Sequence, residues 1–235
     1  MSRPAAKQQR TPPSLLEVVQ GLLQRTYRIR CGLARLDRFV IGDRGFKLLY
    51  GGAGPVRAAA SADGAGARTL VRESEEGLRA CIYYPDALIR QLERFPPHRG
   101  VGEENVDPFA ALVEELDHLL CLAERSAEGR EITLFELELH ANVSKHLVLS
   151  RFLAGNAGRL SPRRRLWLRH QLFDKLRFCD ANEEVRARYR DAARWAVRFI
   201  DALAEWSGAE RIDVLRRFHR ASAQGKLDVI ESVVQ

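Results

Sequence analysis

Two neighbouring stretches of the sequence place ionisable residues where an amphipathic helix would normally carry apolar ones. In residues 112–120, Glu114 and His118 are four positions apart, so on a helix their side chains share one face within reach of a common ion. Residues 134–146 are apolar enough to be buried, yet they include four polar residues that need partners: Glu136, Glu138, His140 and Lys145. A buried carboxylate is costly unless it is paired or bound to a metal. Because the connection 127–132 is short, we expect the two helices to be antiparallel neighbours that supply each other's partners.

The first stretch resembles the active-site helix of the zincin metallopeptidases, in which an apolar pair precedes His-Glu-x-x-His. Aligned on that pattern, Glu115 matches the general-base glutamate and His118 matches the second zinc-binding histidine, whereas Glu114 replaces the first histidine. The second stretch resembles the downstream Glu-x-x-Ala-Asp of the gluzincin branch, which contributes the third zinc ligand. There Glu138 matches that ligand and Asn142 replaces the aspartate.

This resemblance covers about residues 68–150 and implies both a function and an architecture. It implies a metal-dependent hydrolase of the peptidase type, or a relative that has kept the fold and lost the reaction. It implies a small sheet before the active-site helix, with an edge strand near residues 78–84 that holds an extended peptide beside the ion. Glu115 would then position or deprotonate a water molecule.

The ligand set that the resemblance implies is Glu114, His118 and Glu138, supported by His140 and Lys145. A carboxylate is a competent zinc ligand, so the replacement at position 114 is compatible with zinc. Two carboxylates put more negative charge on the ion than a histidine-rich set does, which weakens its Lewis acidity. Manganese or iron would suit these residue types comparably well. We therefore expect a divalent metal ion, with zinc as the first choice.

Other interpretations of the same residues stay open. The Glu-x-x-His spacing also occurs in di-iron helix bundles, but those need two such motifs and this sequence contains one. Alternatively, Glu114, Glu115 and Asp117 simply face solvent, while Glu138 and Lys145 belong to a polar network in an unrelated helical bundle. Three further histidines have no partner at ligand spacing and are not expected to bind an ion: His98, His170 and His219.

The elements that must position these residues belong to an α+β fold, with an N-terminal helix and a small antiparallel sheet before a mostly helical C-terminal two-thirds. Ser14 is a suitable N-cap for a helix over residues 15–28. Turn residues and β-branched or aromatic runs predict a turn at 42–45 and strands at 38–41, 46–50, 68–72 and 78–84. Pro85 opens a short helix, and Thr133 with Glu136 forms a capping box. Helices are predicted over 108–126, 134–154, 162–178, 182–206, 210–221 and 225–233.

We divide the chain by composition and charge into a disordered N-terminus (1–13), a helix-and-sheet part (14–100), a two-helix metal-site core (101–158) and a basic helical part (159–235). Residues 51–67 are rich in Gly and Ala and predict a flexible loop. The net charge of +7 is unevenly distributed, because residues 101–153 carry 11 acidic and only 4 basic side chains. The acidic centre favours cation binding, and the basic flanks favour an acidic partner.

The alternative function is based on one basic helix. Beyond residue 161, Trp167 is interleaved with four candidate phosphate-binding residues: Arg163, Arg164, Arg165 and Arg169. Such a stripe can neutralise phosphates and stack a ring on a base, which would make the protein a non-catalytic module for an acidic partner or nucleic acid. The helix also has an apolar face for packing, and the sequence contains no helix-turn-helix, RRM or KH signature, so nucleic acid is the less favoured partner.

The remaining composition limits the class of protein. The sequence has no run of 18 apolar residues and no apolar segment after its basic N-terminus, so we expect neither a membrane span nor a secretory signal. Four cysteines lack Cys-x-x-Cys spacing: Cys31, Cys81, Cys121 and Cys179. We interpret them as buried thiols in a reducing compartment, which predicts a cytoplasmic protein.

Overall fold

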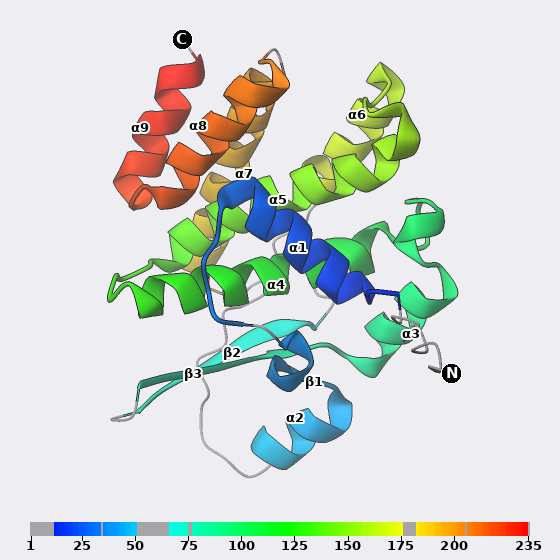
Figure 1. Ribbon diagram of the computed structural model, residues 1–235, viewed down its shortest axis with the longest axis vertical. Helices are drawn as coiled ribbons and strands as arrows, with labels where there is room; N and C mark the ends of the chain where they lie inside the picture. The colour runs from blue at the N-terminus through cyan, green and yellow to red at the C-terminus, as the bar shows by residue number, and fades with distance from the viewer. Residues whose placement is uncertain are drawn as a thin grey trace, which may run out of the picture.

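A computed structural model of the chain describes residues 12–33, 35–50, 66–74, 77–175, 182–204 and 206–234. Our predictions for most of the N-terminal segment, for most of the loop at 51–67 and for Cys179 lie outside these residues. The predicted α+β class is confirmed: one small sheet lies among helices, and the C-terminal part is helical (Figure 1).

The N-terminal helix, α1 (Leu15–Tyr27), begins where the sequence predicts. The hydroxyl of Ser14 accepts a hydrogen bond from the backbone N–H of Glu17, and the Glu17 carboxylate accepts one from the backbone N–H of Ser14. This capping box satisfies two donors that the helix itself leaves open. Val19, Leu23 and Tyr27, spaced four apart, are buried on one face of the helix, so Tyr27 reaches the centre of the molecule.

The sheet has three strands in the order β1-β3-β2 and is mixed rather than purely antiparallel: β1 (Val40–Ile41), β2 (Arg68–Ser74) and β3 (Gly77–Tyr83). The predicted hairpin of 68–72 with 78–84 is confirmed, with Thr69 opposite Ile82 in antiparallel register. Val40 also pairs with Ile82, in parallel. The expected edge strand near 78–84 is therefore wrong, because β1 and β2 occupy both sides of β3.

A helix replaces the strand predicted at 46–50 and the turn predicted before it. Residues Asp43–Tyr50 form α2, preceded by a short 3-10 helix η1 (Leu36–Phe39). Asp43 lies in the first turn of α2 and accepts a hydrogen bond from the hydroxyl of Tyr83 at 2.7 Å. The ring of Phe46 stacks on the ring of Tyr83. These contacts to β3 outweigh the β-propensity of the segment, which was the basis of our prediction.

The other α-helices follow the predicted order and begin within two residues of the predicted starts, whereas the two short 3-10 helices that lie between them were not predicted. They are α3 (Asp86–Arg94), η2 (Pro97–Arg99), α4 (Val106–Ala127), α5 (Leu134–Ala154), η3 (Gly155–Ala157), α6 (Pro162–Arg169), α7 (Glu183–Leu203), α8 (Gly208–Arg220) and α9 (Ala223–Val234). After α6 the backbone widens into a π-helical turn, η4 (His170–Asp174). Among the described residues, no helix combines the length and the apolar character needed to cross a membrane.

Helix α4 is the central element of the fold. Figure 1 shows the sheet along one side of α4, with α5 and the C-terminal helices on the other. On the sheet side, the hydroxyl of Thr69 donates to the carbonyl of Glu115 at 3.1 Å, and the hydroxyl of Tyr84 donates to the carbonyl of Leu112 at 2.7 Å. Helix α5 is covered in turn by α7. Both α4 and α5 are therefore buried around most of their circumference, polar residues included.

Candidate metal centre

Helices α4 and α5 bring together the three side chains that the resemblance implied as metal ligands. Glu114 and His118 of α4 and Glu138 of α5 each offer one ligand atom, and these atoms all lie within 4.8 Å of one another. None of the three residues is more than 2% exposed. The four-residue spacing of Glu114 and His118 and the antiparallel packing of the two helices together produce this convergence.

The geometry of His118 fits a ligand better than it fits a hydrogen-bonding core residue. Its Nε2 atom lies 3.8 Å from Oε1 of Glu138, too far for a hydrogen bond. Among the described residues, neither ring nitrogen of His118 has a hydrogen-bond partner, and Oε1 of Glu114 has none either. Two atoms bound to one tetrahedral zinc ion lie roughly 3.3–3.6 Å apart. The residues present therefore fit a divalent ion of this class.

Negative charge exceeds positive charge around these ligands. Lys145 of α5 donates from Nζ to Oε2 of Glu114 at 2.7 Å, which leaves Oε1 of Glu114 for an ion. Glu115 and Glu138 add two carboxylates, and Arg188 of α7 adds one further cation close enough to lower the pKa of Glu138. Three carboxylates thus face two cations, and a bound divalent ion would reverse this imbalance.

The pKa shifts of the ligands have a common cause in burial. Burial lowers the pKa of His118 to about 4, so its imidazole is neutral at pH 7 and keeps a lone pair, which is the form that binds metals. Burial and the nearby Glu114 raise the pKa of Glu138 well above its usual range. Binding of a metal ion, which needs the ionised carboxylate, therefore competes with protonation of Glu138.

Glu115, the residue matched to the general base, is also inside the protein. It is fully buried. Burial is the larger cause of the raised pKa of Tyr84, and the charge of Glu115 adds to it. The same charge raises the pKa of Glu138, so Glu115 lies near both the sheet and the ligands. The alternative in which Glu114, Glu115 and Asp117 face solvent is wrong, since none is more than 1% exposed. The cause is the packing of α4 between the sheet and α5, which covers these positions.

His140 was expected beside these ligands but belongs to a second group. Its Nδ1 atom lies 2.8 Å from Oδ2 of Asp117, and its Nε2 atom lies 2.9 Å from Nδ1 of His219. With Cys121, these two histidines form another set whose ligand atoms lie within 4.8 Å of one another. Our expectation that His219 has no partner at ligand spacing is wrong. Helix α8 folds back onto α4 and α5, and sequence spacing carries no signal of that contact.

Glu136 forms structural ion pairs and does not belong to either group of candidate metal ligands. The hydroxyl of Thr133 accepts from its backbone N–H, as the capping box predicts. Its carboxylate turns inward instead, where Oε1 accepts from Nη2 of Arg125 and Nζ of Lys226, each at 2.9 Å. Both cations also donate to the carbonyl of Ala221, just after α8. Glu136 therefore fastens the end of α8 to α4 and α5.

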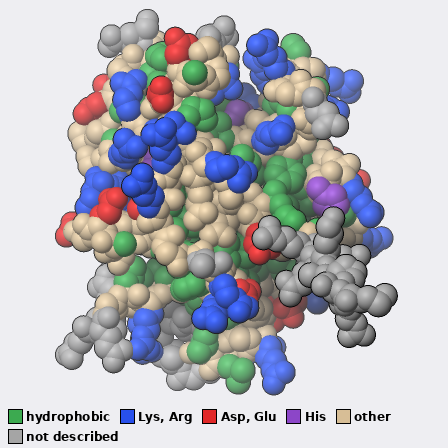
Figure 2. Space-filling view, in the orientation of Figure 1, with side chains coloured by type: hydrophobic (Ala, Val, Ile, Leu, Met, Phe, Trp, Pro, Cys, Tyr) green, Lys and Arg blue, Asp and Glu red, His purple; other side chains and the backbone are tan. Residues whose placement is uncertain are grey.

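The basic residues of α6 lie at the surface, and Figure 2 shows Lys and Arg side chains over much of the face that it draws. Arg163, Arg164 and Arg165 are exposed, although Arg164 donates to the carbonyl of Leu153. Arg169 is half-buried and donates to Asp201 at 2.6 Å. The indole N–H of Trp167 donates to Glu103. The ring and one of the four arginines are thus held by acidic side chains of the protein.

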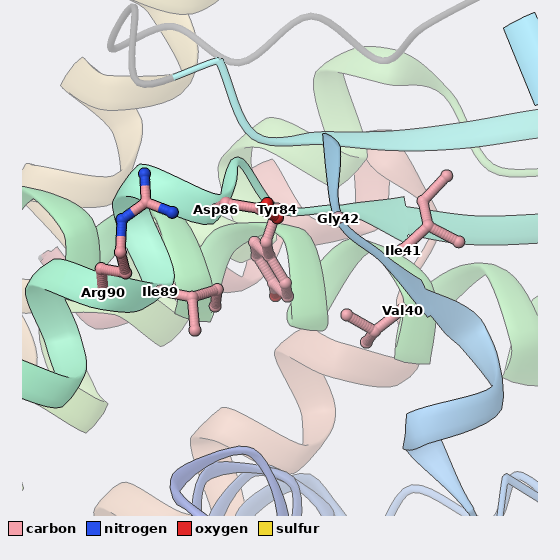
Figure 3. A pocket seen from close by; sticks show the side chains of 7 residues that line it. All are labelled: Val40, Ile41, Gly42, Tyr84, Asp86, Ile89 and Arg90. Carbon is pink, nitrogen blue, oxygen red and sulfur yellow. The ribbon is translucent and has the colours of Figure 1, made fainter. Parts of the chain in front are cut away.

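A cavity of about 240 Å³ lies away from both histidine groups, between β1 and α3 (Figure 3). It is lined by Val40, Ile41, Gly42, Tyr84, Asp86, Ile89 and Arg90. Asp86 already accepts a hydrogen bond from the backbone of Asp43. None of the candidate ligands contributes to this lining.

Comparison of the chain with protein-family models, with curated proteins and with solved structures gave no match. Every functional conclusion below therefore comes from the residues themselves.

Proposed function

We propose that this protein binds a divalent transition-metal ion, zinc first among them, on Glu114, His118 and Glu138, and that it is a zincin-like hydrolase. The observation that carries the proposal is His118, a buried imidazole with both nitrogens unpartnered among the described residues, beside two buried carboxylates. Zinc, manganese and iron all accept such a mixed set of ligands.

In the reaction, the chain supplies three functions. Glu114, His118 and Glu138 hold the ion, and Lys145 fixes the orientation of Glu114 through its 2.7 Å contact. Glu115 accepts the proton of the attacking water at its carboxylate. When bound, the ion supplies the Lewis acidity that polarises a carbonyl and lowers the pKa of water. Burial of all these residues excludes bulk water, which strengthens each electrostatic contact.

Metal content of the purified, dialysed protein tests the binding step. We expect the His118→Ala and Glu138→Gln variants each to lose one equivalent of ion relative to wild type. His98 is exposed and lies in neither histidine group, so His98→Ala is the matched control and should keep the wild-type content. Equal content in wild type and His118→Ala would sink the metal assignment.

Hydrolysis is tested separately on the metal-loaded protein, with a panel of fluorogenic peptides and esters. We expect Glu115→Gln to lose at least about 100-fold in rate while it retains its metal, because general-base catalysis contributes about 10²–10⁴-fold. If the loaded wild type cleaves none of the probes, the protein is a metal-binding relative that has lost the reaction. If Glu115→Gln retains full activity, another residue is the base.

The exposed arginines of α6 support a second candidate function, binding of an acidic macromolecule. Arg163 and Arg165 are exposed to solvent, and neither pairs with an acidic side chain among the described residues. Wild type should then bind a labelled nucleic-acid duplex at low salt, and its affinity should fall steeply as salt is added. The affinity of the Arg163→Gln/Arg165→Gln variant should depend less on salt. Absence of binding at low salt removes this candidate.

A further inference from the structure

We infer that Cys121, His140 and His219 form a second metal site, for a zinc-class ion, independent of the Glu114 group. The three residues come from α4, α5 and α8, and none is more than 5% exposed. One ligand atom from each lies within 4.8 Å of the other two. The two candidate sites share no ligand, so each can be tested without the other.

Each of the two histidines has an outer ring nitrogen, which faces a carboxylate, and an inner one, which faces the other histidine. The hydrogen bonds at the outer nitrogens leave a lone pair on each inner nitrogen. Nδ1 of His140 lies 2.8 Å from Oδ2 of Asp117, and Nε2 of His219 lies 2.6 Å from Oε2 of Glu124. An ionised carboxylate only accepts hydrogen bonds, so in either ring a single proton would be on the outer nitrogen. Such carboxylate–histidine pairs are the usual outer partners of zinc-binding imidazoles, because they fix the tautomer.

The inner nitrogens face each other at a distance that requires a positive centre. Nε2 of His140 and Nδ1 of His219 are 2.9 Å apart, and in the neutral rings both are acceptors. Two acceptors held this close repel each other unless a proton or a metal ion joins them. A zinc ion would separate the two nitrogens by only a few tenths of an ångström, to roughly 3.3 Å.

Cys121 favours the metal ion over the shared proton. Its Sγ atom lies within 4.8 Å of one ligand nitrogen of each histidine. It approaches His140 from the Asp117 side, 3.4 Å from the outer nitrogen Nδ1 and 3.9 Å from Oδ2 of Asp117, so an ion between the inner nitrogens would draw the thiolate inward. A thiolate with two imidazoles is a set that zinc prefers over magnesium or calcium. The thiol proton and the proton shared by the two rings both leave to solvent as the ion binds, so one divalent ion replaces two protons and the charge of the site is unchanged.

Aromatic rings pack around the two histidines of this group. The ring of Tyr27 lies 4.5 Å from the ring of His140 and 5.1 Å from that of His219, centre to centre. The ring of Phe218 stacks near His140 at 5.7 Å. Three protein ligands leave one tetrahedral position for a further ligand such as water, and the binding free energy of an ion that requires the folded chain contributes to folding. The ion would join α8 to the two central helices.

Cobalt titration distinguishes this site from the first, because the Glu114 group contains no sulfur. Full-length protein, stripped with a chelator and kept reduced, is titrated with Co²⁺ as the probe. We expect a thiolate-to-cobalt absorption band in the near ultraviolet that saturates at about one equivalent. The band should be lost in Cys121→Ser, and kept in His118→Ala and in the matched control Cys31→Ser. No band in wild type, or an equal band in Cys121→Ser, overturns the proposal.

X-ray absorption on zinc-loaded protein keeps the test independent of whether Cys121→Ser folds. In His118→Ala, which lacks a ligand of the first site, we expect one sulfur neighbour per zinc at about 2.3 Å, with nitrogen neighbours at about 2.0–2.1 Å. A shell of nitrogen and oxygen alone in both wild type and His118→Ala overturns the second site. A shared proton would then remain as the group that joins the two rings, and the proposed function would still be decided by the metal content of His118→Ala.

Discussion

Nε2 of His140 lies 2.9 Å from Nδ1 of His219, although 79 positions separate the two residues. The contact depends on how α8 ends. The carbonyls of His219 and Ala221 accept hydrogen bonds from Arg125 and Lys226, and both cations are held by Oε1 of Glu136. One buried carboxylate therefore determines where the ring of His219 lies.

Replacement of Glu136 by Ala should destabilise the protein by about 3–5 kcal/mol, because removing one partner of a buried pair leaves the other charges without compensation. Arg125 and Lys226 are both buried and would keep only carbonyl partners. Denaturant unfolding followed by circular dichroism measures the change. Glu128, exposed at the end of α4, is the control, and Glu128→Ala should cost less than about 1 kcal/mol. A loss below about 1 kcal/mol for Glu136→Ala would contradict the role assigned to it.

The stability of the metal-free protein should fall as the pH falls from about 6.5 to 4. His146 of α5 has a buried Nδ1 atom, and burial lowers its pKa to about 4, against the usual 6.5; the charge of Asp201 opposes this shift and that of Arg211 adds to it. Between those pH values the unfolded chain binds a proton that the folded chain does not, so protonation favours unfolding. His146 alone should contribute on the order of 2 kcal/mol to the difference between pH 7 and pH 5.

Unfolding of wild type and His146→Gln at pH 7 and pH 5 isolates this contribution. The difference between the two pH values should be smaller in the variant, because glutamine does not titrate. Both proteins must be stripped of metal, since protons also compete with any bound ion. Identical pH dependence in the two proteins would show that His146 is solvated in the folded state.

Added zinc should stabilise the stripped protein. Any ion that binds only the folded state stabilises it by about 2.7 kcal/mol at a free concentration 100 times its dissociation constant. We expect the melting temperature to rise with zinc in wild type, to rise less in His118→Ala and in Cys121→Ser, and to stay unchanged when both substitutions are combined. Calorimetric scans at fixed protein concentration measure this. A full response in the double variant would place the zinc elsewhere.

Much of the fold was predictable, because local signals agreed with the tertiary structure. Ser14 caps α1, Asn182 caps α7, and the periodic apolar residues of both helices face the interior. The strand predicted at 46–50 was wrong, since contacts of Phe46 with Tyr83 favour a helix there. Sequence alone carries no information about that contact. The same is true of β1, whose parallel pairing turned the expected edge strand into a central one.

The candidate site divides in the same way. Glu114 and His118 could be found from helical periodicity, and Glu138 from the short connection between two helices. His219 could not, because its neighbours His140 and Cys121 lie far from it in sequence and no motif links them. Ionisable residues spaced along one helix can be recognised in a sequence. A set that is completed by a later helix, as α8 completes the set of Cys121 and His140, can be recognised only in the three-dimensional structure.

Lys145 provides a further prediction that separates a metal site from a core salt bridge. Its ammonium group, 2.7 Å from Oε2 of Glu114, repels any cation bound to the other oxygen of that carboxylate. Lys145→Met removes this repulsion and keeps the length of the side chain. We therefore expect the metal-free variant to be less stable than wild type, by about 3–5 kcal/mol, because Glu114 is left buried without its cation.

If Glu114 ligates an ion, zinc should restore most of that loss, and the variant should bind zinc more tightly than wild type, since the ion no longer shares this carboxylate with the ammonium group of Lys145. Isothermal titration calorimetry on stripped protein measures the affinity, and Lys145→Arg, which keeps the charge, is the matched control. In a core salt bridge without an ion, Lys145→Met would be destabilised to the same extent with and without zinc. That result would mean that Glu114 has a structural role and binds no ion, and His118 would have no assigned function.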